Sequence, residues 1–158
     1  MSMFGLYPKK KIRVKLADDQ RVIAIGDIHG QRMRLSKLMA RVDDYRKQKP
    51  VAEEHIVFLG DFVDRGPYSA DIIEYLAKRA KKAKKSAHSE IFLHGNHEEL
   101  LLEGLDHEGT RHDVWWRNGG MQTVDSYLKY QKVDVPKNIE PEEKLQLFRE
   151  HFPKQHLK

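Results

Sequence analysis

Three short apolar segments of the chain each lead into a polar loop that contains glycine. They are Arg21 to Ile25 before GDIHG, His55 to Leu59 before GDFVDRG, and Glu90 to Leu93 before HGNHE. Each segment is rich in Val, Ile, Leu or Phe and lacks a clean polar–apolar alternation, which is typical of strands buried on both faces. We therefore predict three buried β-strands that end in polar loops.

Amphipathic segments separate these strands. Gln31 to Gln48 carries apolar residues at the spacing of one helical face, and Pro50 follows it. The same pattern recurs after the second strand, over Ser69 to Lys85. Beyond the third strand we expect a polar linker over Lys132 to Pro141. The pattern also predicts three further helices, at Glu99 to Leu105, Asn118 to Tyr130 and Pro141 to Phe152.

Strands that alternate with helices predict an α/β fold with a mostly parallel sheet flanked by helices. In such a sheet the loops that follow the strands meet at one edge, which is the usual place for a ligand. All three glycine-containing polar loops fall at this edge. The chemistry of the chain is therefore expected there.

Composition narrows the possible classes of protein. The chain of 158 residues is predicted to form one domain, with residues 1–20 as a lead-in. It contains no cysteine, which excludes disulfides, thiolate zinc sites and cysteine nucleophiles. We find no apolar run of about 18 residues and no signal-peptide core, so we expect a cytoplasmic protein without a membrane partner.

A formal net charge of +5 permits an anionic partner. Part of this charge lies in the run KRAKKAKK, from Lys78 to Lys85, at the end of the second predicted helix. The run is better explained as a solvated helix end, where cations interact favourably with the helix dipole. Nucleic-acid binding is the weaker interpretation, because no aromatic residue interrupts the lysines.

Seven residues with metal-binding or catalytic side chains occupy the three strand-end loops. Each of these residues, taken alone, can be explained by a structural role, such as capping a helix or stabilising a turn. Together they place carboxylates, imidazoles and an amide at equivalent points of three successive strands, which capping does not explain. They are Asp27, His29, Asp61, Asp64, Arg65, Asn96 and His97.

Oxygen ligands beside imidazole, without thiolate, suit Mn, Fe or Zn. A carboxylate placed between two such ions can bridge them, as in two-metal phosphoester hydrolases, where bound water loses a proton near neutral pH. A neighbouring guanidinium would hold phosphate oxygens, and a positioned imidazole would protonate the leaving oxygen.

The motifs GDIHG, GDFVDRG and GNHE, in this order, resemble the calcineurin-like metallophosphoesterase superfamily. Within it they are most similar to the phosphoprotein phosphatase branch, which includes bacterial serine/threonine phosphatases and symmetrical diadenosine tetraphosphatases. The segment WWRNGGMQTVDSY, from Trp115 to Tyr127, is similar to one that follows GNHE in bacterial members. We interpret Trp115 and Trp116 as packing residues. The resemblance begins near Arg21 and implies the first half of the family's β-sandwich.

The resemblance implies two divalent metal ions, of Mn, Fe or Zn. Asp27 and His29 would bind the first ion, and Asp61 would bridge both ions. Asn96 would bind the second ion and contact the substrate phosphate. These roles agree with the ligand chemistry inferred from the residues themselves.

The resemblance also implies the groups that act on the substrate. Arg65 would bind its phosphate, and His97 would be the general acid. Asp64 would orient the His97 imidazole through a hydrogen bond, which fixes the tautomer.

Family members continue beyond GNHE into a second half that supplies two more metal-binding histidines and another phosphate-binding arginine. We find no counterpart of that half, so the second metal site lacks its imidazoles. The chain is therefore expected to be a metallophosphoesterase domain truncated at its C-terminal side. The histidines that come after GNHE follow no Val/Ile-rich strand and are interpreted as surface or helix residues; they are His107, His112, His151 and His156.

Three functions remain open. The leading one is a metal-dependent phosphoesterase for phosphate monoesters, acting on phosphoproteins as a serine/threonine phosphatase. The second is a dinucleoside polyphosphate hydrolase with a nucleotide substrate. The third is a weakened remnant that serves as a metal-binding or interaction domain. Half of a sandwich would expose a sheet edge and apolar faces, so we also expect self-association.

Overall fold

The computed structural model describes residues 15–83 and 89–157 of the chain. A three-stranded sheet lies at its centre, with β2 between β1 and β3 and both strand pairs parallel. The strands are β1 (Gln20–Ile25), β2 (Glu53–Phe58) and β3 (Ser89–Phe92). The two crossovers are α1 (Arg32–Gln48) and α2 (Ser69–Ala83). This arrangement confirms the predicted α/β fold with a parallel sheet.

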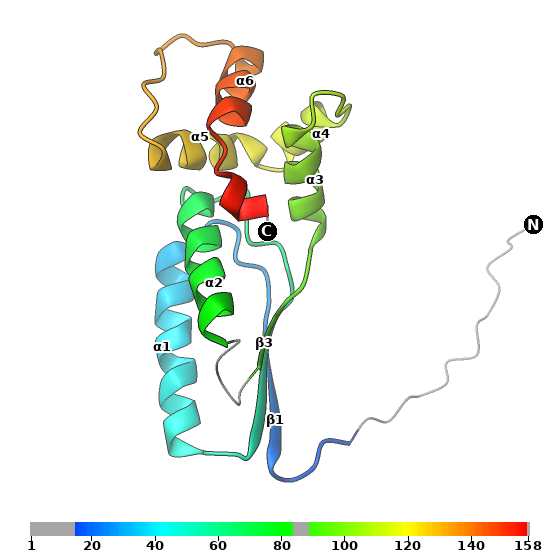
Figure 1. Ribbon diagram of the computed structural model, residues 1–158, viewed down its shortest axis with the longest axis vertical. Coiled ribbons are helices and arrows are strands. Elements are labelled where there is room, and N and C mark those ends of the chain that lie inside the picture. The colour runs from blue at the N-terminus through cyan, green and yellow to red at the C-terminus, as the bar shows by residue number, and fades with distance from the viewer. Residues whose placement is uncertain (1–14, 84–88, 158) are drawn as a thin grey trace, which may run out of the picture.

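The remaining helices gather beyond the carboxyl ends of the strands (Figure 1). They are α3 (Asn96–Leu105), α4 (His112–Arg117), α5 (Gly120–Tyr130), α6 (Pro141–His151) and the short 3-10 helix η1 (Lys154–Leu157). None of the helices in the described part of the chain is long and apolar enough to span a membrane.

Helices α3 and α4 differ from the prediction by more than two residues. Helix α3 begins at Asn96 rather than Glu99, because a tertiary hydrogen-bond network organises its first turn. Helix α4 was not predicted, since a helix of 6 residues is too short to show a recognisable hydrophobic period. Lys84 and Lys85, the predicted end of the second helix, lie outside the described residues.

Among the described residues the sheet is covered on one face only, so the prediction of strands buried on both faces is wrong there. Helices α1 and α2 lie on the same side of the sheet (Figure 1). On that side Ile25, Ile56 and Phe58 are buried. The opposite face includes Val22 and Ile91, whose exposed fractions are 45% and 42%. Apolar residues on both faces of a strand therefore do not mean that both faces are covered in this chain.

The side chain of His156 is buried, which corrects its interpretation as a surface histidine, whereas its place in the short helix η1 agrees with the alternative of a helix histidine. Its side chain has no exposed area and lies between α2 and α5. Nε2 donates to Glu74 Oε2 at 3.0 Å, because a carboxylate accepts only, and Nδ1 then accepts from the Tyr127 hydroxyl at 3.1 Å. The hydrogen bond from His156 lowers the pKa of Glu74, and burial raises the pKa of Tyr127.

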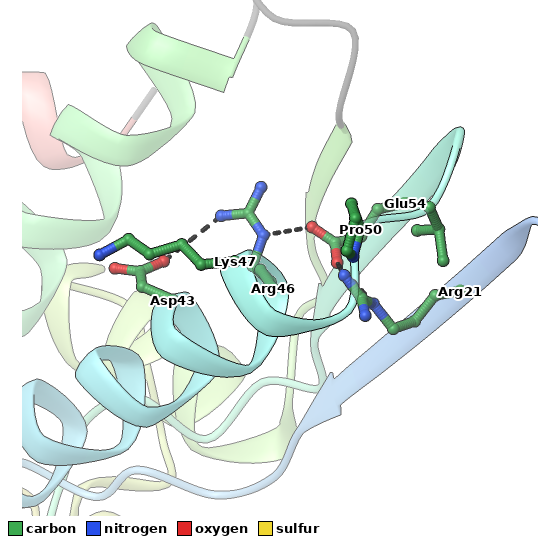
Figure 2. Close-up of a pocket in the computed structure, with 7 residues that line it drawn as sticks. Arg21, Asp43, Arg46, Lys47, Pro50 and Glu54 are labelled. Atoms are coloured by element: carbon green, nitrogen blue, oxygen red, sulfur yellow. Dashed lines mark hydrogen bonds and ion pairs between the residues drawn. The ribbon is translucent and has the colours of Figure 1, made fainter.

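A buried carboxylate lies at the other end of the sheet. Glu54, near the start of β2, is 1% exposed and accepts hydrogen bonds from Arg21 and Arg46. Figure 2 shows these side chains around a cavity of about 360 Å³, which Asp43, Lys47, Pro50 and Val51 also line. The cavity lies at the amino ends of the strands, opposite the loops that carry the predicted site.

We expect Glu54→Ala to lower the free energy of unfolding by about 2 kcal/mol, because it leaves Arg21 and Arg46 without their shared partner. The loss stays moderate since Arg46 reaches water, with 27% of its side chain exposed. Urea unfolding followed by circular dichroism measures the change. Asp44→Ala is the control, because Asp44 is exposed and pairs loosely with Lys47 at 3.8 Å. Equal stability of the two variants would contradict the prediction.

We expect the exposed sheet face to mediate self-association, since exposed apolar surface is favourably removed from water. The double variant Val22→Thr with Ile91→Thr keeps residues that suit strands and should shift the chain towards monomer. Sedimentation over a range of concentrations measures this. Met33→Gln, which removes an exposed apolar side chain from α1, should leave association unchanged. A wild type that sediments as a monomer throughout contradicts the prediction.

Candidate metal centre

Four of the predicted site residues have a left-handed backbone. Their φ angles are +43° at His29, +53° at Asp61, +69° at Asp64 and +63° at Arg65. Such angles are uncommon outside glycine and cost about 1–3 kcal/mol each, so they persist only where other contacts hold them. Strain of this kind is typical of functional sites.

Backbone hydrogen bonds join the loops that follow β1 and β2. The Asp61 carbonyl accepts from the amides of Ile28 at 3.0 Å and His29 at 2.9 Å. The Gly30 amide donates to the Phe62 carbonyl at 2.9 Å. The parallel register places the ends of β1 and β2 side by side, and these bonds then hold His29 beside Asp61.

The carboxylate of Glu98 joins the loop after β2 to the start of α3. Its Oε2 accepts from the amides of Asp61 at 2.8 Å and Gly95 at 2.9 Å. Its Oε1 accepts from Phe62 at 2.7 Å and Val63 at 3.3 Å. Sequence reasoning missed Glu98, although its place three residues after Gly95 is the place of a helix-capping acid.

Gly95 allows the third loop to approach the second. A Cβ at this position would lie 2.2 Å from Asp61 Oδ1, which is closer than any contact allows. The same Oδ1 accepts from the His97 amide at 3.1 Å, in the first turn of α3. The Asp61 carboxylate is thus held at the amino end of a helix, where the dipole favours negative charge.

His29, Asp61 and His97 come together at the carboxyl ends of the strands. In the part of the chain that the structure describes they are the group of acidic and histidine residues close enough to share an ion, with one ligand atom from each within 4.8 Å of the others. His29 Nδ1 donates to the Val63 carbonyl at 2.9 Å, so Nε2 carries the lone pair.

That Nε2 atom is buried and has no hydrogen-bond partner among the described residues. A buried polar atom without a partner is costly unless it binds a ligand. A carbonyl that fixes the other ring nitrogen is also the usual arrangement behind a metal-binding histidine. His29 and Asp61 therefore fit a divalent ion.

The other two predicted metal ligands lie at the rim. The Asp27 side chain is 66% exposed, and its Oδ2 lies 3.8 Å from His29 Nε2. Asn96 is the first residue of α3 and is exposed beside His97. The structure thus brings His29 and Asp61 together, with Asp27 near the first and Asn96 at the outer edge.

The predicted Asp64–His97 pair is present and buried. His97 Nδ1 donates to Asp64 Oδ2 at 2.7 Å, and both side chains are almost without exposed area. Arg65 Nη2 donates to His97 Nε2 at 3.1 Å. Because a carboxylate only accepts and a guanidinium only donates, these contacts define a neutral imidazole protonated at Nδ1.

Two further donors to Asp64 were not predicted as functional. The Trp115 indole lies 3.0 Å from both carboxylate oxygens, and the Thr123 hydroxyl lies 2.7 Å from Oδ1. The expectation that Trp115 is a packing residue is confirmed by its full burial, but the residue also makes this polar contact. The only sequence signal for this contact was the similarity of the WWRNGG segment to one that follows GNHE in family members.

Residues 20–155 match the calcineurin-like phosphoesterase family. The chain belongs to this family. The match covers the three loops and the helices beyond them, so the recognised motifs and the observed geometry agree. Members of the family generally bind two divalent metal ions, whereas the described residues group the ligands of one.

Among curated proteins the chain is similar to three phosphatases. It is 27% identical over 95 residues to Shewanella-like protein phosphatase 2 of Arabidopsis thaliana, covering 59% of this chain and 24% of that protein. It is 37% identical over 90 residues to Shewanella-like protein phosphatase 1 of Plasmodium berghei (strain Anka), covering 53% and 24%. It is 29% identical over 101 residues to serine/threonine-protein phosphatase BSL2 of Arabidopsis thaliana, covering 57% and 9%.

The chain therefore spans a quarter or less of the length of these relatives. Among solved structures it is similar to a mutant cold-active protein tyrosine phosphatase, with 23% identity and a TM-score of 0.45 over 66% of this chain and 35% of that chain.

We expect Glu98→Gln to lower the free energy of unfolding by about 2–3 kcal/mol, because its amide group would face backbone donors with a donor of its own. It should also weaken Mn²⁺ binding, since Asp61 loses its support. Urea unfolding and isothermal titration calorimetry measure the two effects. The control is Glu99→Gln, an exposed neighbour in the same helical turn. If both variants match the wild type, Glu98 does not organise the loop.

Proposed function

We propose that the chain carries part of a metal-dependent phosphoesterase site and hydrolyses phosphate monoesters, with serine/threonine phosphoproteins as substrates. The observation that carries the proposal is the buried His29 Nε2, which faces Asp61 and His97 without a partner among the described residues. The family match supports the reaction class.

His29 and Asp61 are the residues that would hold the ion, with Asp27 beside them at 3.8 Å from His29 Nε2. A divalent ion supplies a Lewis acid that neutralises phosphate charge and lowers the pKa of bound water. Manganese is the ion that we propose, because carboxylate and imidazole ligands without thiolate suit it.

Arg65 is the residue that would bind the substrate phosphate. The Arg65 amide donates to the Gly119 carbonyl at 3.1 Å, which holds its backbone. Arg65 itself is exposed. A guanidinium binds two phosphate oxygens at once through its planar donors. When Arg65 turns to the phosphate, the Nε2 atom of His97 loses its donor and can take up a proton from solvent, which gives the imidazolium that would protonate the leaving oxygen.

His97 is the residue that would deliver a proton to the leaving oxygen from Nε2. Asp64 holds the opposite ring nitrogen at 2.7 Å, so the ring cannot turn away from the site. Transfer by a positioned imidazole contributes typically about 10²- to 10⁴-fold in rate. The family resemblance and the geometry support the same assignment of roles.

Serine/threonine specificity is supported by one relative, the serine/threonine-protein phosphatase BSL2, which is similar to this chain over 101 residues. No contact among the described residues favours a dinucleoside polyphosphate over a phosphoprotein. Hydrolysis of a dinucleoside polyphosphate is therefore measured as the competing activity in the experiment below. The same experiment distinguishes a metal-binding remnant without activity.

We expect the chain to hydrolyse p-nitrophenyl phosphate and a phosphoserine peptide in the presence of Mn²⁺. His97→Ala should lower kcat by about 100-fold or more, because the proton donor is lost. Asp61→Ala should abolish both hydrolysis and Mn²⁺ binding measured by calorimetry, and a chelator should do the same to the wild type. His107→Ala, which removes an exposed histidine outside the three loops, is the matched control.

Equal rates for the wild type, His97→Ala and Asp61→Ala would overturn the proposed activity. Faster hydrolysis of diadenosine tetraphosphate than of the phosphoserine peptide would overturn the substrate assignment. Mn²⁺ binding that depends on Asp61 without any hydrolysis would identify a metal-binding remnant and overturn the proposed reaction.

A further inference from the structure

The carboxylate of Asp64 lies at the centre of a closed hydrogen-bond network. Its exposed fraction is 0%, and it accepts from three side chains that come from three different helices. His97 in α3 donates to Oδ2 at 2.7 Å. Thr123 in α5 donates to Oδ1 at 2.7 Å, and Trp115 in α4 donates at 3.0 Å to both oxygens.

The directions of these bonds are determined by the chemistry of the groups. An indole N–H is a donor only, and an ionised carboxylate is an acceptor only. The Thr123 hydroxyl must therefore use its hydrogen for Asp64 Oδ1, and its oxygen accepts from the Asp64 amide at 2.8 Å. Thr123 thus holds both the side chain and the backbone of Asp64, where φ is +69°.

Tight packing holds Trp115 in place. Its exposed fraction is 0%, and two glycines lie against its ring. A Cβ at Gly104 would lie 2.2 Å from Cζ3, and a Cβ at Gly120 would lie 2.6 Å from Cδ1. These close contacts oppose rotation of the indole, whose Nε1 points at Asp64. The α4–α5 junction also accepts from the Arg65 amide at Gly119.

We propose that Trp115 and Thr123 are positioning residues for His97 and act through Asp64. They restrict the carboxylate to one rotamer, which restricts the imidazole to the position that hydrolysis requires. This inference rests on the proposed function. It assigns the helical layer beyond the sheet a part in the reaction, in addition to its packing.

A carboxylate that accepts from three fixed donors is less free to rotate than one that accepts from the imidazole alone. Without Trp115 and Thr123, Asp64 could rotate and the His97 ring would move with it. A displacement of about 1 Å in a reacting group can cost about 100-fold in rate. Substrate binding through Arg65 and the ion would change little, so the effect belongs in kcat rather than in KM.

The test compares Trp115→Phe and Thr123→Val with variants matched in burial or position. Trp116→Phe alters the neighbouring ring, which stacks on Trp115 at 5.1 Å between centroids. Ser126→Ala removes another buried hydroxyl of α5, which accepts from the Ala70 amide instead. Thr123→Ser restores the hydroxyl and should recover the wild-type behaviour.

Two readouts are measured on the full chain. With Mn²⁺ and p-nitrophenyl phosphate, Trp115→Phe and Thr123→Val should lower kcat by about 10- to 100-fold with KM unchanged. By proton NMR of the chain labelled at histidine, the Nδ1 proton of His97 should give a resonance protected from water in the wild type. This resonance should broaden in the same two variants and stay sharp in Trp116→Phe, Ser126→Ala and Thr123→Ser.

Loss of thermal stability with kcat and the Nδ1 resonance equal to those of the controls would overturn the proposal, because the contacts would then be structural only. If Trp115→Phe does not fold, Thr123→Val and its rescue by Thr123→Ser decide the matter alone. A wild type without hydrolysis whose Nδ1 resonance still depends on Thr123 would overturn the proposed function and support the positioning.

Discussion

The strained loops depend on carboxylates that are buried in the fold. Four residues of the site have positive φ, at a cost of about 1–3 kcal/mol each, which local sequence preference does not offset. Glu98 accepts four backbone amides from two loops, and so compensates part of that cost by satisfying donors that would otherwise be buried without partners. The position of Asp61 follows from this arrangement.

Asp64 extends the same principle to the helices beyond the sheet. Its carboxylate joins α3, α4 and α5 at one point, where an error in packing would leave a buried charge with too few donors. Trp115, which donates to Asp64, packs in turn against Phe148, and Phe148 packs against Tyr127. The geometry of the Asp64–His97 pair and the packing of this layer are therefore hard to change independently.

The two faces of the sheet have different roles. One face packs against α1 and α2, and its amino end is held by the Glu54 carboxylate between two arginines. The other face exposes apolar residues. The chain belongs to the calcineurin-like phosphoesterase family, and its curated relatives are at least four times as long as the region they share with it. The site lies at the carboxyl edge of the sheet, where both faces and the three loops meet.

The three strands, the two crossover helices and the loops that carry the candidate site were predictable from the chain alone, because strands with a buried face give apolar runs and the loops after them combine glycine with polar residues. His29, Asp61, Asp64 and His97 were named as candidates in these loops, and the structure brings them together, while their roles stay predictions. The sequence could not show that Glu98, Trp115 and Thr123 contact the same loops. Apart from the local Gly95 amide, their partners are backbone amides and a carboxylate from 35 to 59 residues away, and such contacts exist only after the helices pack. The tertiary structure also decided which nitrogen of His29 faces the site, because the Val63 carbonyl takes the other one.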